Sequence, residues 1–101
     1  MITIVARLWI APGLDAAFRD YERRALALFG EHGGEVVAAF EPRRVGGADG
    51  ECDEVHVLRI ATDAALAAWR ADPRVAALAD ERARVIARSE VIISARDVDV
   101  R

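Results

Sequence analysis

A chain of 101 residues is one domain by length, and its 53% hydrophobic residues supply a core without disulfides or metal ions. The 14 basic and 17 acidic residues give a net charge of −3, which argues against nucleic acid as a partner. The apolar start, MITIVARLWI, is too short to span a bilayer and lacks the features of a signal peptide. We therefore expect a single cytoplasmic domain over residues 1–101, with no membrane partner.

The first half of the chain predicts a strand, a helix and a second strand. Residues 2–10 are rich in β-branched residues and stop at a turn signal, Ala-Pro-Gly, at 11–13. From Leu14 onward apolar residues recur at three- and four-residue steps, which is typical of an amphipathic helix. The Gly-Gly pair at 33–34 ends that helix, because glycine tolerates the left-handed conformation found there. Residues 35–41 (EVVAAFE) follow as the second strand.

The second half predicts a strand, an interrupted helix and a last strand. A glycine- and charge-rich loop at 43–54 leads into the third strand, 54–61. Thr-Asp at 62–63 suits a helix N-terminus, and Asp-Pro at 72–73 restarts the helix with a cap and a proline at its first position. The fourth strand is expected at 90–98. The second helical piece carries Val75, Leu78, Arg82, Val85 and Ile86 at helical spacing.

The one cysteine, Cys52, lies in the polar loop. It cannot form an internal disulfide, which fits a reducing compartment. No histidine is close enough in sequence to activate it, so an unpaired surface thiol is a better interpretation than a nucleophile.

The order β-α-β-β-α-β predicts an α+β, ferredoxin-like fold, in which a four-stranded antiparallel sheet carries both helices on one face. The strands are apolar on both faces, although two helices cover only one. We therefore expect a second copy of the chain to cover the other face, giving a homodimer. In the first strand one parity holds Ile2, Ile4, Ala6 and Leu8, and the other holds Val5 and Trp9.

The segments HGGEVVAAFEP, DEVHVLRI and AAWRADPRVAAL, with the closing strand, resemble the dimeric α/β-barrel superfamily. In particular they are similar to a small bacterial family known as domain-of-unknown-function family 1330. The resemblance covers nearly the whole chain, and its most specific pieces are residues 32–34 and 69–73. It implies two sheets packed face to face across a dimer, but no reaction.

The wider superfamily includes antibiotic-biosynthesis monooxygenases, haem-degrading enzymes, muconolactone isomerases and NIPSNAP proteins. Trp69 stands where the resemblance to haem-degrading enzymes implies a tryptophan. Their haem-binding histidine would fall at Ala79, and the asparagine of their first strand is absent. The resemblance therefore implies no haem and no other cofactor, and it weakens the case for cofactor-independent oxygenation.

Two histidines are candidate catalytic residues. His32 lies in the last turn of the first helix, where an imidazole complements the helix dipole and bonds free carbonyls; its alternative role is that of a general base. His56 shares strand parity with Glu54, Leu58 and Ile60. It is either a hydrogen-bonded core histidine or a catalytic base.

Arg7 and Arg59 are candidate ligand-binding residues, because each lies inside an apolar strand and needs an acceptor. One interpretation is an ion pair across the dimer, with Glu41 or Asp97. The other is a clamp for a small acid. By parity both arginines should lie on the side of the sheet away from the helices, and His56 on the helix side.

Trp69 and Tyr21 are further candidates for a ligand pocket, although their helical spacing also suits core residues. Two histidines and one cysteine at wide separations match no metal-ligand spacing, so no metal is expected. The glycines at 46–47 and 50 are not followed by a helix, which argues against a phosphate-binding loop. No serine-histidine-aspartate signature is present.

Two classes of function remain open. One is a cofactor-free enzyme, isomerase- or monooxygenase-like, that acts on a small organic molecule in a pocket between sheet and helices. The other is a non-catalytic dimeric binding or assembly module. A histidine beside an arginine in one closed cavity would favour the enzyme, and a cavity filled by Trp69, Tyr21 and Phe18 would favour the module.

Overall fold

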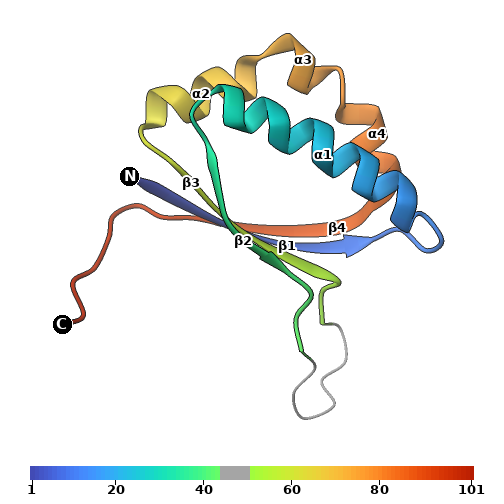
Figure 1. Ribbon diagram of the computed structural model, residues 1–101, viewed down its shortest axis with the longest axis horizontal. Coiled ribbons are helices and arrows are strands. Elements are labelled where there is room, and N and C mark those ends of the chain that lie inside the picture. Colours follow the sequence, from blue (N-terminus) through green and yellow to red (C-terminus); the bar gives the residue numbers. More distant parts are fainter. Residues whose placement is uncertain (44–50) are drawn as a thin grey trace.

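The computed structural model describes residues 1–43 and 51–101, and in them the expected β-α-β-β-α-β order is present. The four strands form one antiparallel sheet in the order β2-β3-β1-β4, and the helices lie on one face of it (Figure 1). The fold is therefore α+β and ferredoxin-like, as predicted. Its elements are β1 (Ile2–Ile10), α1 (Asp15–Glu31), β2 (Glu35–Phe40), β3 (Glu54–Ile60), α2 (Asp63–Ala71), α3 (Pro73–Ala76), α4 (Ala79–Val85) and β4 (Ile86–Ile93).

The ends of the helices follow the local signals of the sequence. Gly13 and Gly33 adopt positive φ angles of 76° and 83°, so each permits a turn that other residues resist. The Thr62 hydroxyl accepts a hydrogen bond from the Ala65 N–H at 3.1 Å and caps α2. The Asp72 carboxylate does the same for α3, accepting from the Arg74 N–H at 2.8 Å.

The last strand was predicted too late in the chain. β4 begins at Ile86 and ends at Ile93, rather than spanning 90–98, and the preceding helical stretch is interrupted between α3 and α4. Ile86 pairs with Ile10 at the end of β1, so the chain passes directly from α4 into the sheet. Residues 88–90 (Arg-Ser-Glu) have low strand propensity, and their pairing with residues 7–9 of β1 makes them part of the strand.

The core lies between the sheet and the helices. Alternate residues of the two central strands point into it, because side chains alternate between the faces of a strand. Phe18, Phe29, Ile60 and Val85 are its most deeply buried side chains. The buried strand residues on this face are Ile2, Ile4, Ala6 and Leu8 of β1 and Glu54, His56, Leu58 and Ile60 of β3. The predicted parity of both strands is confirmed.

The opposite face of the sheet, here called the open face, carries no helix (Figure 1). Its centre is apolar, since Val5 lies opposite Val57 on β3 and Ile92 on β4. Ile92 is 66% exposed, and Phe40 near one edge is 48% exposed. No helix in the described part of the chain is long and apolar enough to cross a membrane.

Cys52 is buried, with 5% of its surface exposed, so the interpretation as a surface thiol was wrong. Two bonds of its neighbour Asp53 hold this segment against β1: the Asp53 N–H donates to the Leu8 carbonyl, and the Asp53 carboxylate accepts from the Ile10 N–H, both at 2.8 Å. Of the loop predicted at 43–54, including its glycines, residues 44–50 lie outside the described residues.

Candidate functional site

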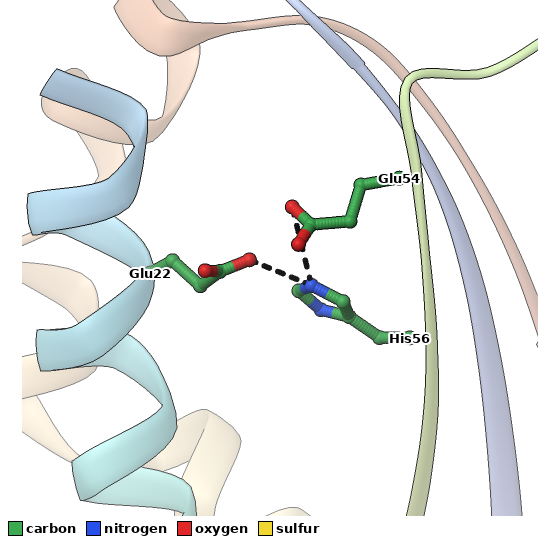
Figure 2. Close-up of side chains that lie close together, drawn as sticks. All are labelled: Glu22, Glu54 and His56. Atoms are coloured by element: carbon green, nitrogen blue, oxygen red, sulfur yellow. Dashed lines mark hydrogen bonds and ion pairs between the residues drawn. The ribbon is translucent and has the colours of Figure 1, made fainter. Parts of the chain in front are cut away.

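Three polar side chains meet between α1 and the sheet: Glu22, Glu54 and His56. Glu54 and His56 are two residues apart on β3 and therefore share its helix-facing side. Glu22 reaches them from α1, and the three side chains point toward one another (Figure 2). Both β3 residues are about 5% exposed. A polar cluster buried so deeply in an apolar layer needs internal partners.

The imidazole of His56 lies between the two carboxylates. Its Nε2 atom is hydrogen-bonded to Oε2 of Glu22 at 2.7 Å and lies 3.6 Å from Oε2 of Glu54 (Figure 2). The Glu54 Oε2 atom is buried and forms no hydrogen bond within the described residues. Glu22 is therefore the strong partner of His56, and Glu54 lies beside the pair.

Arg19 holds both carboxylates from the other side. Its Nη1 atom donates to Oε1 of Glu54 at 2.6 Å and to Oε1 of Glu22 at 3.1 Å. Arg19 and Glu22 are three residues apart on α1, so they lie on one face of that helix. Because each Oε1 is bound to the guanidinium, each Oε2 is turned toward the imidazole. Arg19 thus fixes the geometry of the cluster and balances part of its negative charge.

The pKa values of the two glutamates are shifted in opposite directions. Burial alone would raise the pKa of Glu22, but hydrogen bonds from His56, Glu54 and Arg19 lower it well below the ordinary value. Burial raises the pKa of Glu54, and the neighbouring Glu22 raises it further, against the opposing effect of Arg19. Glu22 is therefore the ionised carboxylate beside His56, and Glu54 is the one that takes up a proton first.

This difference predicts losses of unequal size from the same substitution at two positions. We expect Glu22→Gln to lower the free energy of unfolding by about 1.5 kcal/mol at pH 7, because the partly buried hydrogen bonds to His56 and Arg19 lose the charge of their acceptor. We expect Glu54→Gln to cost less than about 0.5 kcal/mol, because glutamine still accepts from Arg19 and removes a carboxylate that burial disfavours. Urea unfolding measures both values, with Glu31→Gln, an exposed position on the same helix, as the control.

The pH dependence separates the two positions further. The lowered pKa of Glu22 stabilises the folded protein above the ordinary glutamate pKa, and this contribution is lost in acid. The raised pKa of Glu54 has the opposite sign: stability decreases as the pH rises through it. Stability should therefore fall less with rising pH above 4.5 in Glu54→Gln than in the unmodified protein. Equal losses from both substitutions would contradict the assignment.

The cluster borders a cavity of about 110 Å³ between the sheet and the helices. His56 and Glu22 lie in its wall, together with Arg82, and the rest of the wall is largely apolar. A second cavity of about 260 Å³ lies farther out, between α1 and the residues of α2, α3 and α4. The two cavities share four wall residues: Tyr21, Ala25, Trp69 and Arg82. We call them the inner and outer cavities.

The walls of the inner cavity show features of both function classes, the enzyme and the non-catalytic binding module. A histidine and an arginine border one cavity, as expected for an enzyme, but the cavity is partly open to solvent rather than closed, and the arginine is Arg82. Trp69, Tyr21 and Phe18 also border the inner cavity, yet they leave it open. Trp69 packs edge-on against Phe29 with ring centroids 5.3 Å apart. Tyr21 packs against the part of the core that contains Phe18 and Val85. Both aromatic residues are core and pocket wall at once.

Arg7 and Arg59 lie away from these cavities, on the open face, as predicted from parity. Arg7 pairs with Glu90 of the same chain at 3.6 Å and lies over the Trp9 ring, 5.4 Å from its centroid. Arg59 is exposed. Neither arginine can act on a molecule in the inner cavity together with His56. Their expected ion pairs with Glu41 or Asp97 across a dimer remain a prediction.

His32 caps the C-terminus of α1, but not by bonding free carbonyls with its imidazole. Its Nε2 atom lies 2.9 Å from Oδ2 of Asp72, the residue that caps α3. The pKa of Asp72 is held far below its ordinary value, first by Arg74 and then by His32. His32 therefore ties the end of α1 to the start of α3, and it is not in the wall of either cavity.

Sequence reasoning missed Glu22, Arg19 and Arg82 as site residues. Glu22 and Arg19 lie off the apolar stripe of α1, which is the usual position of solvated residues. A signal did exist for Glu54, which shares strand parity with His56. The three side chains of the cluster could also bind a divalent ion, because one ligand atom from each lies within 4.8 Å of the others. The spacing rules for histidine and cysteine could not reveal such a set.

No family model matches the chain, and no curated protein matches it. Several solved structures do. The RPA0582 protein of unknown function from Rhodopseudomonas palustris is 21% identical, with a TM-score of 0.79 over 97% of this chain and 83% of that one. A NIPSNAP domain protein from Burkholderia xenovorans is 14% identical, with a TM-score of 0.69 over 96% and 95%. SnoaB from Streptomyces nogalater, a cofactor-independent oxygenase, is 20% identical, with a TM-score of 0.70 over 98% and 95%.

These likenesses establish the fold. The ferredoxin-like architecture of this chain is the one found in NIPSNAP proteins and in a cofactor-independent oxygenase. At such identities the activity of a neighbour does not carry over. The narrower resemblance to family 1330 stays a prediction.

Proposed function

We propose that this protein is a cytoplasmic homodimer that binds a small organic molecule in the inner cavity and moves a proton with His56. One observation carries the proposal: a buried imidazole, hydrogen-bonded to the ionised Glu22, borders an otherwise largely apolar cavity. A carboxylate in this position stabilises the imidazolium that forms when histidine takes up a proton. Arg19 keeps the carboxylates in place and does not touch the ligand.

The reaction that suits these groups is proton abstraction next to a carbonyl. The C–H bond of the ligand breaks, its proton passes to the imidazole, and its electron pair moves onto the carbonyl oxygen as an enolate. Return of the proton to another carbon yields an isomer and restores neutral His56. No cofactor is needed for this sequence.

A second candidate is oxygenation, in which the same carbanion reacts with dioxygen. The likeness to SnoaB favours it, because that protein is described as a cofactor-independent oxygenase on the same fold. The first step at His56 is common to both reactions. Both are therefore tested by the same measurement of proton removal.

The open face supports the homodimer. Val5, Val57 and Ile92 form its apolar centre, and no helix covers them. Exposed apolar patches of this kind usually mark an interface. A second copy has the same patch and would bury it by a two-fold contact.

The test of proton transfer is deuterium exchange. Cyclic ketones are first screened for binding by thermal shift, and the ketones that bind are then incubated with the protein in D₂O. We expect the α-protons of a bound ketone to exchange about 100-fold faster than without protein, as followed by proton NMR. Binding without faster exchange would favour the non-catalytic module instead.

A further inference from the structure

The outer cavity has an unusual charge distribution. Two arginines lie in its wall, Arg70 from the last turn of α2 and Arg82 from α4, and none of the described acidic residues does. The remaining wall is aromatic or aliphatic, including Trp69 and Val75.

Neither arginine is neutralised within the described residues. Arg19, Arg24 and Arg74 each form ion pairs with carboxylates. Arg70 forms none among these residues, and the Arg82 guanidinium interacts only with neutral groups, donating to the Ser89 hydroxyl at 3.3 Å and hydrogen bonding with the Tyr21 hydroxyl. Glu81, which directly precedes Arg82 in the sequence, is bound to Arg24. Both guanidinium groups therefore remain able to bind an anion.

Arg82 also borders the inner cavity, where Glu22 and His56 lie. A molecule that occupies both cavities therefore meets a carboxylate and an imidazole at its inner end and guanidinium groups at its outer end. Its middle lies against Tyr21, Ala25 and Trp69, which border both cavities. An anionic group at the inner end would be repelled by Glu22, whereas at the outer end it would face the guanidinium groups of Arg70 and Arg82.

From this arrangement we infer that the ligand is an apolar organic acid, whose carboxylate binds Arg82 and Arg70 and whose body enters the inner cavity. The inference rests on the proposed function, because it concerns a ligand of the same pocket, and it adds the class of that ligand. The planar guanidinium group matches a carboxylate by two parallel hydrogen bonds. The inner cavity, at about 110 Å³, has room for little more than one ring, and a short chain then spans the outer cavity.

The test compares an acid with its neutral isostere. 3-Phenylpropionate and 3-phenylpropanamide have the same ring and chain length and differ in the charge of the end group. We expect the acid to bind about tenfold more tightly by isothermal titration, because only the acid carries a charge that the two exposed arginines attract. Arg82→Gln should reduce this preference for the acid by about fivefold. Arg84→Gln, at an exposed arginine of α4 outside both cavities, should leave it unchanged.

Salt provides a second readout. The advantage of the acid should shrink as ionic strength rises, while binding of the amide stays constant. If the acid binds no more tightly than the amide, or if Arg84→Gln weakens it as much as Arg82→Gln, the inference is overturned. In that case binding of neutral ketones and their deuterium exchange would still support the proposed function, so the two failures can be distinguished.

Discussion

Replacing His56 with glutamine is expected to slow deuterium exchange of a bound ketone by about 100-fold, the usual contribution of a general base. Glutamine is polar and near in size to histidine, and its amide can still donate to Glu22, but it does not take up a proton near neutral pH. Ligand affinity should therefore change far less than the exchange rate. Proton NMR in D₂O measures the rate, and titration of the same ketone measures the affinity.

His32→Gln is the matched control for this variant, because it removes the only other imidazole in the chain. Its partner Asp72 and both helix ends lie outside the cavity walls. We expect unchanged ligand binding and exchange, and a melting temperature lower by at most about 5 °C. A loss of exchange in His32→Gln with full activity in His56→Gln would transfer the catalytic role to His32.

Val5→Lys is expected to abolish the proposed homodimer. Val5 lies at the centre of the open face, with Val57 and Ile92 as its cross-strand neighbours. A lysine there would place two like charges near a two-fold axis in an apolar interface, at a cost of several kcal/mol. Light scattering should then give a monomer of 11.0 kDa, or an unfolded chain, where the unmodified protein gives twice that mass.

Val100→Lys introduces the same charge at a position that is 90% exposed in the C-terminal segment, so the dimer should survive it. A stable, folded monomer for the unmodified protein at micromolar concentration would contradict the dimer. The cavities and the cluster lie within one chain, so ligand binding should then be examined in the monomer as well.

Local signals of the sequence were sufficient for the framework. The turn at Gly13, the helix end at Gly33 and the caps at Thr62 and Asp72 depend only on neighbouring residues. The alternation of side chains between the two faces of a strand also depends only on local sequence, and it correctly predicted His56 on the helix side and Arg7 on the open face. A fold built from short-range signals of this kind can be predicted from one sequence.

The start of β4 shows where such signals end. Residues 88–90 are polar, and their strand conformation comes from pairing with β1, which is more than seventy residues away in sequence. Cys52 is a similar case, since the N–H and the carboxylate of Asp53 both bond to the backbone of β1 and hold the loop end, with its buried thiol, against the sheet. Long-range pairing overrides local propensity at both places.

The sequence by itself determined the order of elements, the two faces of the sheet and the position of His56 beneath the helices. Only the tertiary structure decided what His56 meets there. Glu22 and Arg19 lie off the apolar stripe of α1, and the packing of that helix over β3 turns them toward Glu54 and the imidazole. The cavities depend on the same packing, because a wall shared by Tyr21, Trp69 and Arg82 exists only once three helices are docked on the sheet. Residue spacing determines the direction of a side chain within its element, whereas its neighbours are set by how separate elements fit together.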